Sequence, residues 1–175
     1  MDNKIKDALS DSIRGFRLPR YRELPDVGLY LDQITKYINQ NVAPLGFSEL
    51  TGSMIRNYVK QGLVDNPVNK QYSANQIAHL VVISILKQVI PLEHIGSFFC
   101  LQQKVYSDEI AYDYFCDELE NILYHRFGLK DESAAVGVTD TLEKEMLRSA
   151  IVAASHIVYL NACLSVLADK NNRNT

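Results

Sequence analysis

Residues 47–95 read FSELTGSMIRNYVKQGLVDNPVNKQYSANQIAHLVVISILKQVIPLEHI. A hydroxyl at Ser48 predicts a short helical turn over the next two residues. Thr51 predicts the cap of a second helix, because a side-chain oxygen can accept a hydrogen bond from the helix's first free N–H groups. Gly62 predicts the end of that helix, since glycine tolerates the left-handed conformation that often follows a last turn.

The second half of this stretch predicts two further helices. Ser73 and Gln76 have the S-x-x-Q spacing of a capping box, which is typical of a helix start. The apolar repeat that follows predicts a long helix to about Val89, and Pro91 breaks it. The chain is then predicted to resume as a helix over residues 92–102.

The helix after Thr51 is predicted to have two different faces. At about 100° per residue, one side is apolar and the other is polar. The polar side groups a hydroxyl, a guanidinium, an amide and an ammonium, from Ser53, Arg56, Asn57 and Lys60. Arginine can bind guanine and asparagine can bind adenine through paired hydrogen bonds in the major groove, whereas serine and lysine more often hold phosphates.

The order of elements supports a DNA-binding interpretation. Helix, turn, helix, loop and helix is the order of a winged helix-turn-helix, in which the second helix enters the major groove. The loop before Ser73 would be the wing. We therefore predict that double-stranded DNA is the partner. The candidate DNA-binding residues are Thr51, Ser53, Arg56, Asn57, Lys60, Lys70, Gln71 and Tyr72.

The motifs T-G-S-M-I-R-N-Y-V-K-Q-G-L-V, P-V-N-K-Q-Y-S and P-L-E-H-I resemble the DNA-binding part of MerR-like regulators. In that family a helix with Arg-Tyr-Tyr ends at Gly-Leu, a wing ends at Tyr-Ser, and a Leu-Glu-Glu-Ile segment follows. This chain differs from the pattern where Asn57 replaces the first tyrosine, and its wing is shorter. The positions that match are Arg56, Tyr58, Gly62, Leu63, Tyr72, Ser73, Leu92, Glu93 and Ile95.

A second resemblance covers most of the chain. The stretches LPRYRELPDVGLYLDQ, LTGSMIRNYVKQGLV and NKQYSANQIAHLVVISILKQV are similar to a family of uncharacterised proteins from Gram-positive bacteria, described only as a domain of unknown function. Membership of that family implies no established activity.

The rest of the chain is also predicted to be helical, so the fold class is all-α. Apolar residues recur at spacings of three and four, and strand signals are almost absent. The predicted helices outside the central stretch cover residues 3–14, 26–41, 107–127 and 140–168. We therefore divide the chain into an N-terminal helical extension (1–46), a winged helix-turn-helix region (47–95) and a helical C-terminal region (96–175).

Charge and cysteine content set the expected environment. Residues 1–90 carry a net charge of +3 and residues 91–175 a net charge of −6. Only the first part therefore suits a polyanionic partner. Cys100, Cys116 and Cys163 have no metal-binding spacing and are interpreted as reduced, buried side chains. Together with an N-terminus interrupted by charges, they predict a cytoplasmic protein.

The C-terminal helix is predicted to join two copies of the chain. The stretch SAIVAASHIVYLNACLSVLA (149–168) has the length of a membrane span, but serine, histidine and asparagine dilute it, so a buried helix or a dimer seam is preferred. The apolar surface of residues 140–168 is broad for one small protein, so we expect a homodimer and no membrane association.

No catalytic site is predicted. The four histidines have no metal-binding spacing, and there is no phosphate-binding loop or nucleophile motif, so we expect no enzyme activity, no metal and no cofactor. An acidic stripe on the 107–127 helix, formed by Glu109, Asp113, Asp117 and Glu120, is expected to face solvent or a partner. A small-molecule effector and a protein-interaction module that does not bind DNA remain open alternatives.

Overall fold

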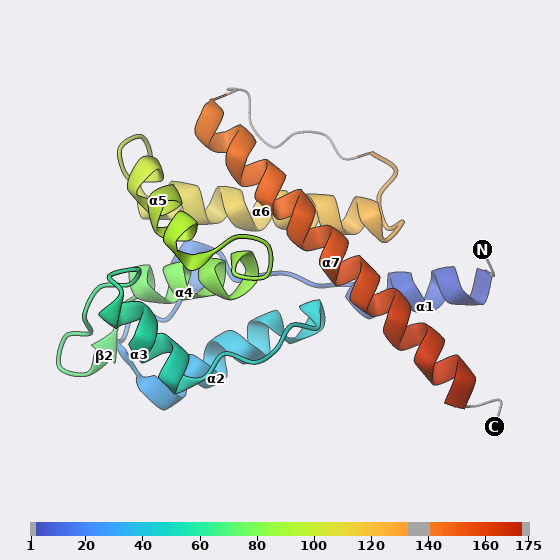
Figure 1. Ribbon diagram of the computed structural model, residues 1–175, viewed down its shortest axis with the longest axis horizontal. Helices are drawn as coiled ribbons and strands as arrows, with labels where there is room; N and C mark the ends of the chain where they lie inside the picture. Colours follow the sequence, from blue (N-terminus) through green and yellow to red (C-terminus); the bar gives the residue numbers. More distant parts are fainter. Residues whose placement is uncertain (1–2, 133–140, 173–175) are drawn as a thin grey trace.

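The computed structural model describes residues 3–132 and 141–172, and it is all-α. Helix accounts for 68% of the structure, and one small two-stranded sheet accompanies it. In chain order the α-helices are α1 (Asn3–Ile13), α2 (Leu31–Val42), α3 (Gly52–Lys60), α4 (Ala74–Leu86), α5 (Leu92–Gln102), α6 (Asp108–Arg126) and α7 (Leu142–Asn172). The strands are β1 (Leu29–Tyr30) and β2 (Gln71–Tyr72), and two 3-10 turns, η1 (Tyr21–Glu23) and η2 (Ala43–Leu45), complete the set (Figure 1).

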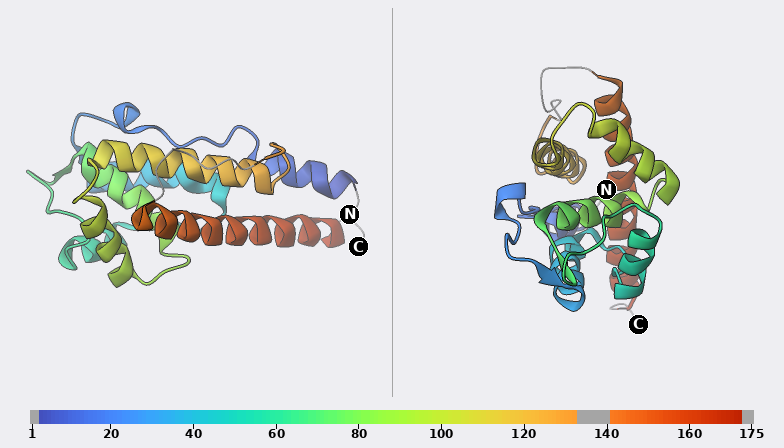
Figure 2. Two further views of the ribbon diagram at one scale, coloured as in Figure 1. Left: turned by 90° about the horizontal axis from the view of Figure 1, so that it is seen from above. Right: turned by 90° about the vertical axis from the view of Figure 1, so that its left-hand side faces the viewer.

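Helix α4 forms the centre of the core. Ten of its thirteen residues are buried, which explains why its sequence is apolar on all sides. It contacts α2 on one side and α6 and α7 on the other. Helices α6 and α7 pack along each other, and the buried Glu118 of α6 is held by Arg148 of α7 at 3.2 Å. The start of α1 and the far end of α7 lie at one end of the molecule (Figure 2).

Helix α2 begins later than the sequence predicts. The predicted helix starts at residue 26, whereas α2 starts at Leu31, because the two residues before it form β1 and pair antiparallel with β2. Gly28 enters this ribbon where a β-carbon would lie 2.7 Å from the Cβ atom of Gln71. A larger residue at position 28 would press against the Gln71 side chain, so glycine suits this place in the ribbon.

The predicted helical turn after Ser48 is absent. Residues 46–51 are not helical, and Leu50 is buried. The side chain of Asn39 takes the place of helical hydrogen bonds: its Oδ1 accepts from the Leu50 N–H at 2.8 Å, and its Nδ2 donates to the Leu50 carbonyl at 2.9 Å. The helix that precedes α3 is therefore α2.

The acidic stripe of α6 has a partner inside the chain. Segment 17–23, which ends in η1, lies along it, and Arg20 donates to Glu120 at 2.7 and 2.8 Å and to Asp117 at 2.7 Å. Backbone N–H groups complete the contact, since Leu18 donates to Glu120 and Tyr21 to Asp113. The expectation that this stripe faces solvent or an external partner is thus corrected.

Helix α7 is only partly covered. Ile151, Ala154 and Val158, near its middle, are buried, whereas Leu160, Leu164 and Leu167 are 47–58% exposed. Within the described ranges, α7 is the one helix that is long and apolar enough to cross a membrane. The core helix of a soluble protein passes the same test of length and composition. In the most apolar window of α7, 28% of the residues are buried. Asp140, where the helix was predicted to start, lies outside the described residues.

Candidate nucleic-acid interface

The orientation of α3 is fixed at both ends and on one side. The hydroxyl of Thr51 accepts a hydrogen bond from the Met54 N–H at 3.2 Å, which confirms the predicted cap. Ile55 and Tyr58 are buried against the core. Gly62 has a φ of 73°, and the next N–H returns to the Tyr58 carbonyl at 3.0 Å, so the helix ends at the glycine as predicted.

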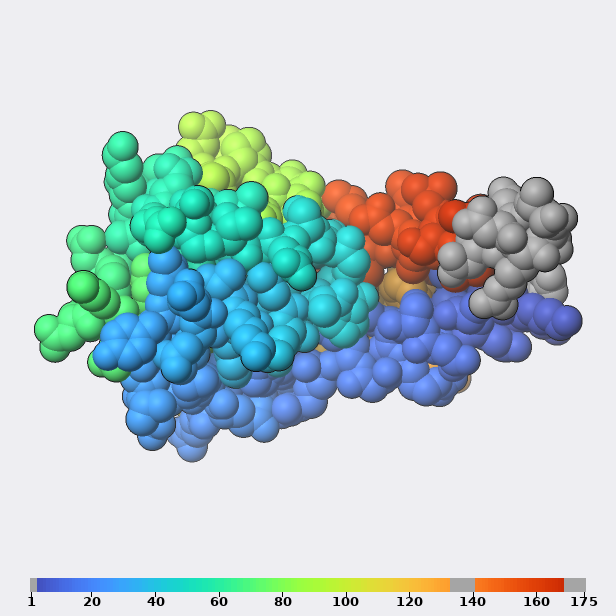
Figure 3. All heavy atoms as spheres, turned by 90° about the horizontal axis from the view of Figure 1, so that it is seen from below, coloured from blue at the N-terminus to red at the C-terminus, as the bar shows by residue number. Residues whose placement is uncertain are grey.

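The four polar residues predicted to read DNA all lie on the exposed side of α3. Ser53, Arg56, Asn57 and Lys60 are each solvent-exposed. Within the described part of the chain, their side chains make a single hydrogen bond, from Arg56 to Ser53 at 3.4 Å. On the face seen in Figure 3, α3 lies at the surface beside α2, and the N-terminal segment runs past without covering it.

A tight hairpin turn over residues 68–71 lies beside α3 and leads into β2, and we count it as part of the β1–β2 ribbon. Val68 and Gln71 exchange two backbone hydrogen bonds of 2.9 and 3.1 Å, and the two residues between them turn the chain. These residues, Asn69 and Lys70, have φ values of 51° and 65°. Two successive left-handed residues are what a two-residue hairpin needs, and asparagine is favoured there. The positive φ strains the backbone of Lys70, and its charged side chain is exposed at this turn.

The remaining two predicted residues have different positions. Gln71 is half-buried in β2, and Tyr72 is 4% exposed. Burial raises the pKa of Tyr72, partly offset by the nearby Arg56 guanidinium. Tyr72 therefore belongs to the hydrophobic core and does not offer a group to a ligand. The capping box behind it is confirmed, since the Ser73 N–H donates to the Gln76 side chain at 2.8 Å.

Sequence reasoning missed one cation close to α3. The ammonium of Lys87, just after α4, lies 3.8 Å from the sulfur of Met54. Partial burial lowers the pKa of Lys87. The only sequence signal was its place at the end of an apolar helix. Among residues 47–72 the exposed charges are Arg56, Lys60 and Lys70 against two carboxylates, so the surface is only mildly positive.

The other candidate groups of the sequence are dispersed. Among the described residues, no three histidine, cysteine or acidic side chains are grouped as metal ligands. His79 is packed as a core histidine, stacked on Phe99 with ring centroids 4.5 Å apart. Cys116 is buried, and burial raises the pKa of its thiol to about 12, but Cys100 is exposed, which corrects the prediction that all three cysteines are buried.

Comparison with known proteins identifies a family and nothing closer. Neither a curated protein nor a solved structure matches the chain at a significant level. One family profile matches residues 19–119, which is more than half of the chain and includes η1, the ribbon and helices α2 to α5. The chain therefore belongs to the family described as Domain of unknown function (DUF1836).

Proposed function

We propose that this protein is a sequence-specific DNA-binding regulator of transcription. The observation that carries the proposal is the outward polar face of α3, which bears groups for base and phosphate contacts that the described part of the chain does not use. In this proposal β1, α2, α3, the ribbon and α4 form a winged helix-turn-helix, with α3 as the recognition helix and the Asn69–Lys70 turn as the wing.

Each residue of the interface has a proposed role. Arg56 and Asn57 would contact base edges in the major groove, and Ser53, Lys60 and Lys70 would contact phosphates. Thr51 caps α3. The N-terminus of α3 carries a partial positive charge from its aligned peptide groups, which would add to the attraction for phosphate. Because the interface carries only three cations, Arg56, Lys60 and Lys70, its binding to DNA of arbitrary sequence should be weak and should fall as salt rises.

The resemblance to MerR-like regulators supports the same assignment. The matched Gly62–Leu63 pair lies at the end of α3, and the matched Tyr72–Ser73 pair lies where the ribbon passes into α4. Leu92 begins α5. These positions are junctions between elements, where a shared architecture constrains the residue type. We also propose a Gram-positive origin, which the second resemblance implies, and a cytoplasmic location, which the interpretation of the cysteines as reduced favours.

A homodimer formed through α7 completes the proposal. The exposed leucines Leu160, Leu164 and Leu167 lie on one side of the second half of α7, opposite the side that packs on the rest of the chain. A second copy would cover them and place two α3 helices on a symmetric operator. Light scattering should give twice the chain mass for the wild type and the single chain mass for a Leu160→Glu/Leu164→Glu variant. A monomeric wild type at micromolar concentration would remove this part of the proposal.

The experiment that tests the function is selection of genomic fragments by the purified full-length protein. Three proteins are compared: the wild type, Arg56→Ala/Lys60→Ala, and Lys6→Ala/Arg14→Ala. The last variant removes the same two charge types from exposed positions in or next to α1, at the far end of the molecule from α3 (Figure 1). We expect the wild type and the α1 variant to enrich one shared motif and the α3 variant to enrich none.

A protein-interaction module is the second candidate. Val27, Tyr30 and Val68, on or beside the ribbon, are 52–74% exposed, and apolar side chains at a wing suit a protein surface better than a phosphate backbone. If all three proteins are folded and none enriches DNA at low salt, this second function replaces the first.

A further inference from the structure

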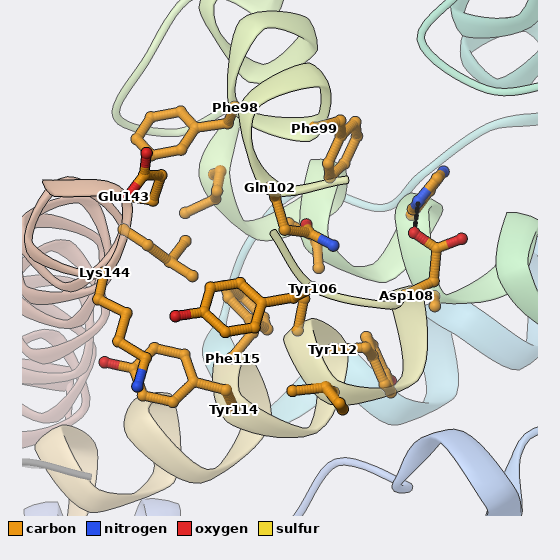
Figure 4. A pocket seen from close by; sticks show the side chains of 17 residues that line it. Phe98, Phe99, Gln102, Tyr106, Asp108, Tyr112, Tyr114, Phe115, Glu143 and Lys144 are labelled. Carbon is orange, nitrogen blue, oxygen red and sulfur yellow. Dashed lines mark hydrogen bonds and ion pairs between the residues drawn. The ribbon is translucent and has the colours of Figure 1, made fainter. Parts of the chain in front are cut away.

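An apolar cavity lies away from α3, between α4, α5, α6 and α7. Its volume is about 110 Å³. Aromatic rings line several sides of it: Phe98 comes from α5, Tyr106 from the turn after it, and Tyr114 and Phe115 from α6 (Figure 4). An engineered apolar cavity of about 150 Å³ stays dry and takes up benzene, so a space of this size suits one small ring system.

The polar groups at the cavity select against a charged ligand. Lys144 lies 5.1 Å from the ring centroid of Tyr114 and 5.8 Å from that of Tyr106, and Glu143 is its neighbour at the same end. The opposite end holds the His79–Asp108 pair, with Nε2 and Oδ1 3.4 Å apart. The amide of Gln102 lies among the rings (Figure 4). Each end thus pairs a basic with an acidic side chain, and the lining between them is apolar.

We propose that this cavity binds a small, neutral aromatic molecule of one or two rings, with a single hydrogen-bonding group that meets Gln102. Edge and face contacts with the surrounding rings would hold the ligand's ring system. Neither the family description nor the sequence motifs assign this site. Binding itself does not depend on the proposed DNA function.

The cavity is placed to influence α3, and this consequence does rest on the proposed function. Its wall includes Ala78, His79 and Val82 of α4, whose other side packs on α2, which in turn packs on α3. His79 also stacks on Phe99 of α5 with the ring planes 18° apart. A ligand that separates α5 and α6 from α4 would shift the helix that supports the DNA-binding unit, so ligand and DNA would change each other's affinity.

Indole is a suitable probe, because the chain has no tryptophan and the emission of indole can be followed without background. We expect a saturable, one-to-one blue shift when indole is titrated into the full-length protein without DNA. Ala111→Leu fills the cavity from a buried position and should abolish the shift. Tyr106→Ala removes one wall from a half-buried position and should weaken binding about five- to tenfold.

Tyr30→Ala is the matched control, since it makes the same change at an exposed ring of β1, outside the cavity. It should bind indole like the wild type. If Ala111→Leu fails to fold, Tyr106→Ala tests whether indole binds in this cavity. The proposal is overturned if neither indole nor phenol saturates the folded wild type at millimolar concentration, or if Tyr106→Ala binds as the wild type does. Because no DNA is present, a negative result leaves the DNA selection untouched, and a failed selection leaves this result untouched.

Discussion

Helices α3 and α6 each carry a polar face, but the molecule uses the two faces differently. On α6 the acidic side chains hold segment 17–23 through Arg20 and two backbone N–H groups. On α3 the side chains of Arg56, Asn57 and Lys60 point to solvent, and in the described ranges only Arg56 has a hydrogen-bond partner, on its own helix. The first face stabilises the fold, and the second is free for an external partner.

The difference lies in desolvation. The side chain of Glu120 is 12% exposed, so its charge requires Arg20 and the Leu18 N–H to offset the loss of water. The polar side chains of α3 are exposed to water, so they carry no desolvation cost in the isolated protein. Changes on α6 should therefore lower stability, whereas changes on α3 should lower binding and leave stability unchanged.

The largest effect is expected for Arg20→Ala. It leaves the mostly buried Glu120 without its cation, which should cost about 3 kcal/mol of unfolding free energy. Arg22→Ala is the matched control, because Arg22 pairs with Glu109 at 2.6 Å while its side chain is 84% exposed. An exposed pair should contribute less than about 1 kcal/mol. Urea unfolding compares the two, and equal losses would contradict the internal role of the α6 face.

The next effect concerns α3. Arg56→Ala and Asn57→Ala should each cost about 1–3 kcal/mol of binding to a selected DNA site and relax the preference at the base pair contacted. Neither should move the urea midpoint, because both side chains are exposed. Fluorescence anisotropy on the selected site and on single-base variants measures both effects. If the variants keep their affinity for DNA but unfold at a lower urea concentration, the polar face of α3 stabilises the fold, as the face of α6 does.

A smaller effect is expected for Asn39→Ala. The change removes the two hydrogen bonds that hold Leu50 ahead of α3, which should cost about 1–2 kcal/mol of stability. It should also weaken DNA binding, because the segment that leads into α3 is no longer held in place. Gln40→Ala, an exposed neighbour on α2, serves as the control in the same urea and anisotropy measurements. If the two variants behave alike, the Asn39 contact does not position α3.

The smallest effect is expected for Lys70→Gly. Glycine accepts the φ of 65° without strain, so the ribbon should keep or gain stability. Loss of one phosphate contact should reduce the slope of log affinity against log salt by about 1 and weaken all DNA sequences alike. An unchanged slope in a salt titration would remove Lys70 from the interface.

The helices were predictable because their signals are local. The Thr51 cap, the Gly62 end and the Ser73–Gln76 capping box lie within a few residues of the turns they define, and all three are confirmed. The apolar repeat of α4 likewise predicted a long helix, which ends three residues earlier than expected.

The contacts that shape the candidate interface join distant residues, so no local pattern predicted them. The β1–β2 ribbon pairs Leu29 with Tyr72, and strands of two residues have no periodicity to detect. The Asn39–Leu50 hydrogen bonds replaced a helical turn that Ser48 seemed to predict locally. The partner of the α6 stripe lies about a hundred positions away along the chain, at Arg20. Exposure of the α3 face, by contrast, followed from helical spacing alone.

The central claim is that α3 and the ribbon form the external interface while the α6 face stays internal. Hydrogen–deuterium exchange of the full-length protein, with and without a selected DNA fragment, tests it most directly. We predict new protection in the first turn of α3 and at residues 68–71, and no change over residues 17–23. Protection over residues 17–23 or α6, with α3 unchanged, would contradict the account.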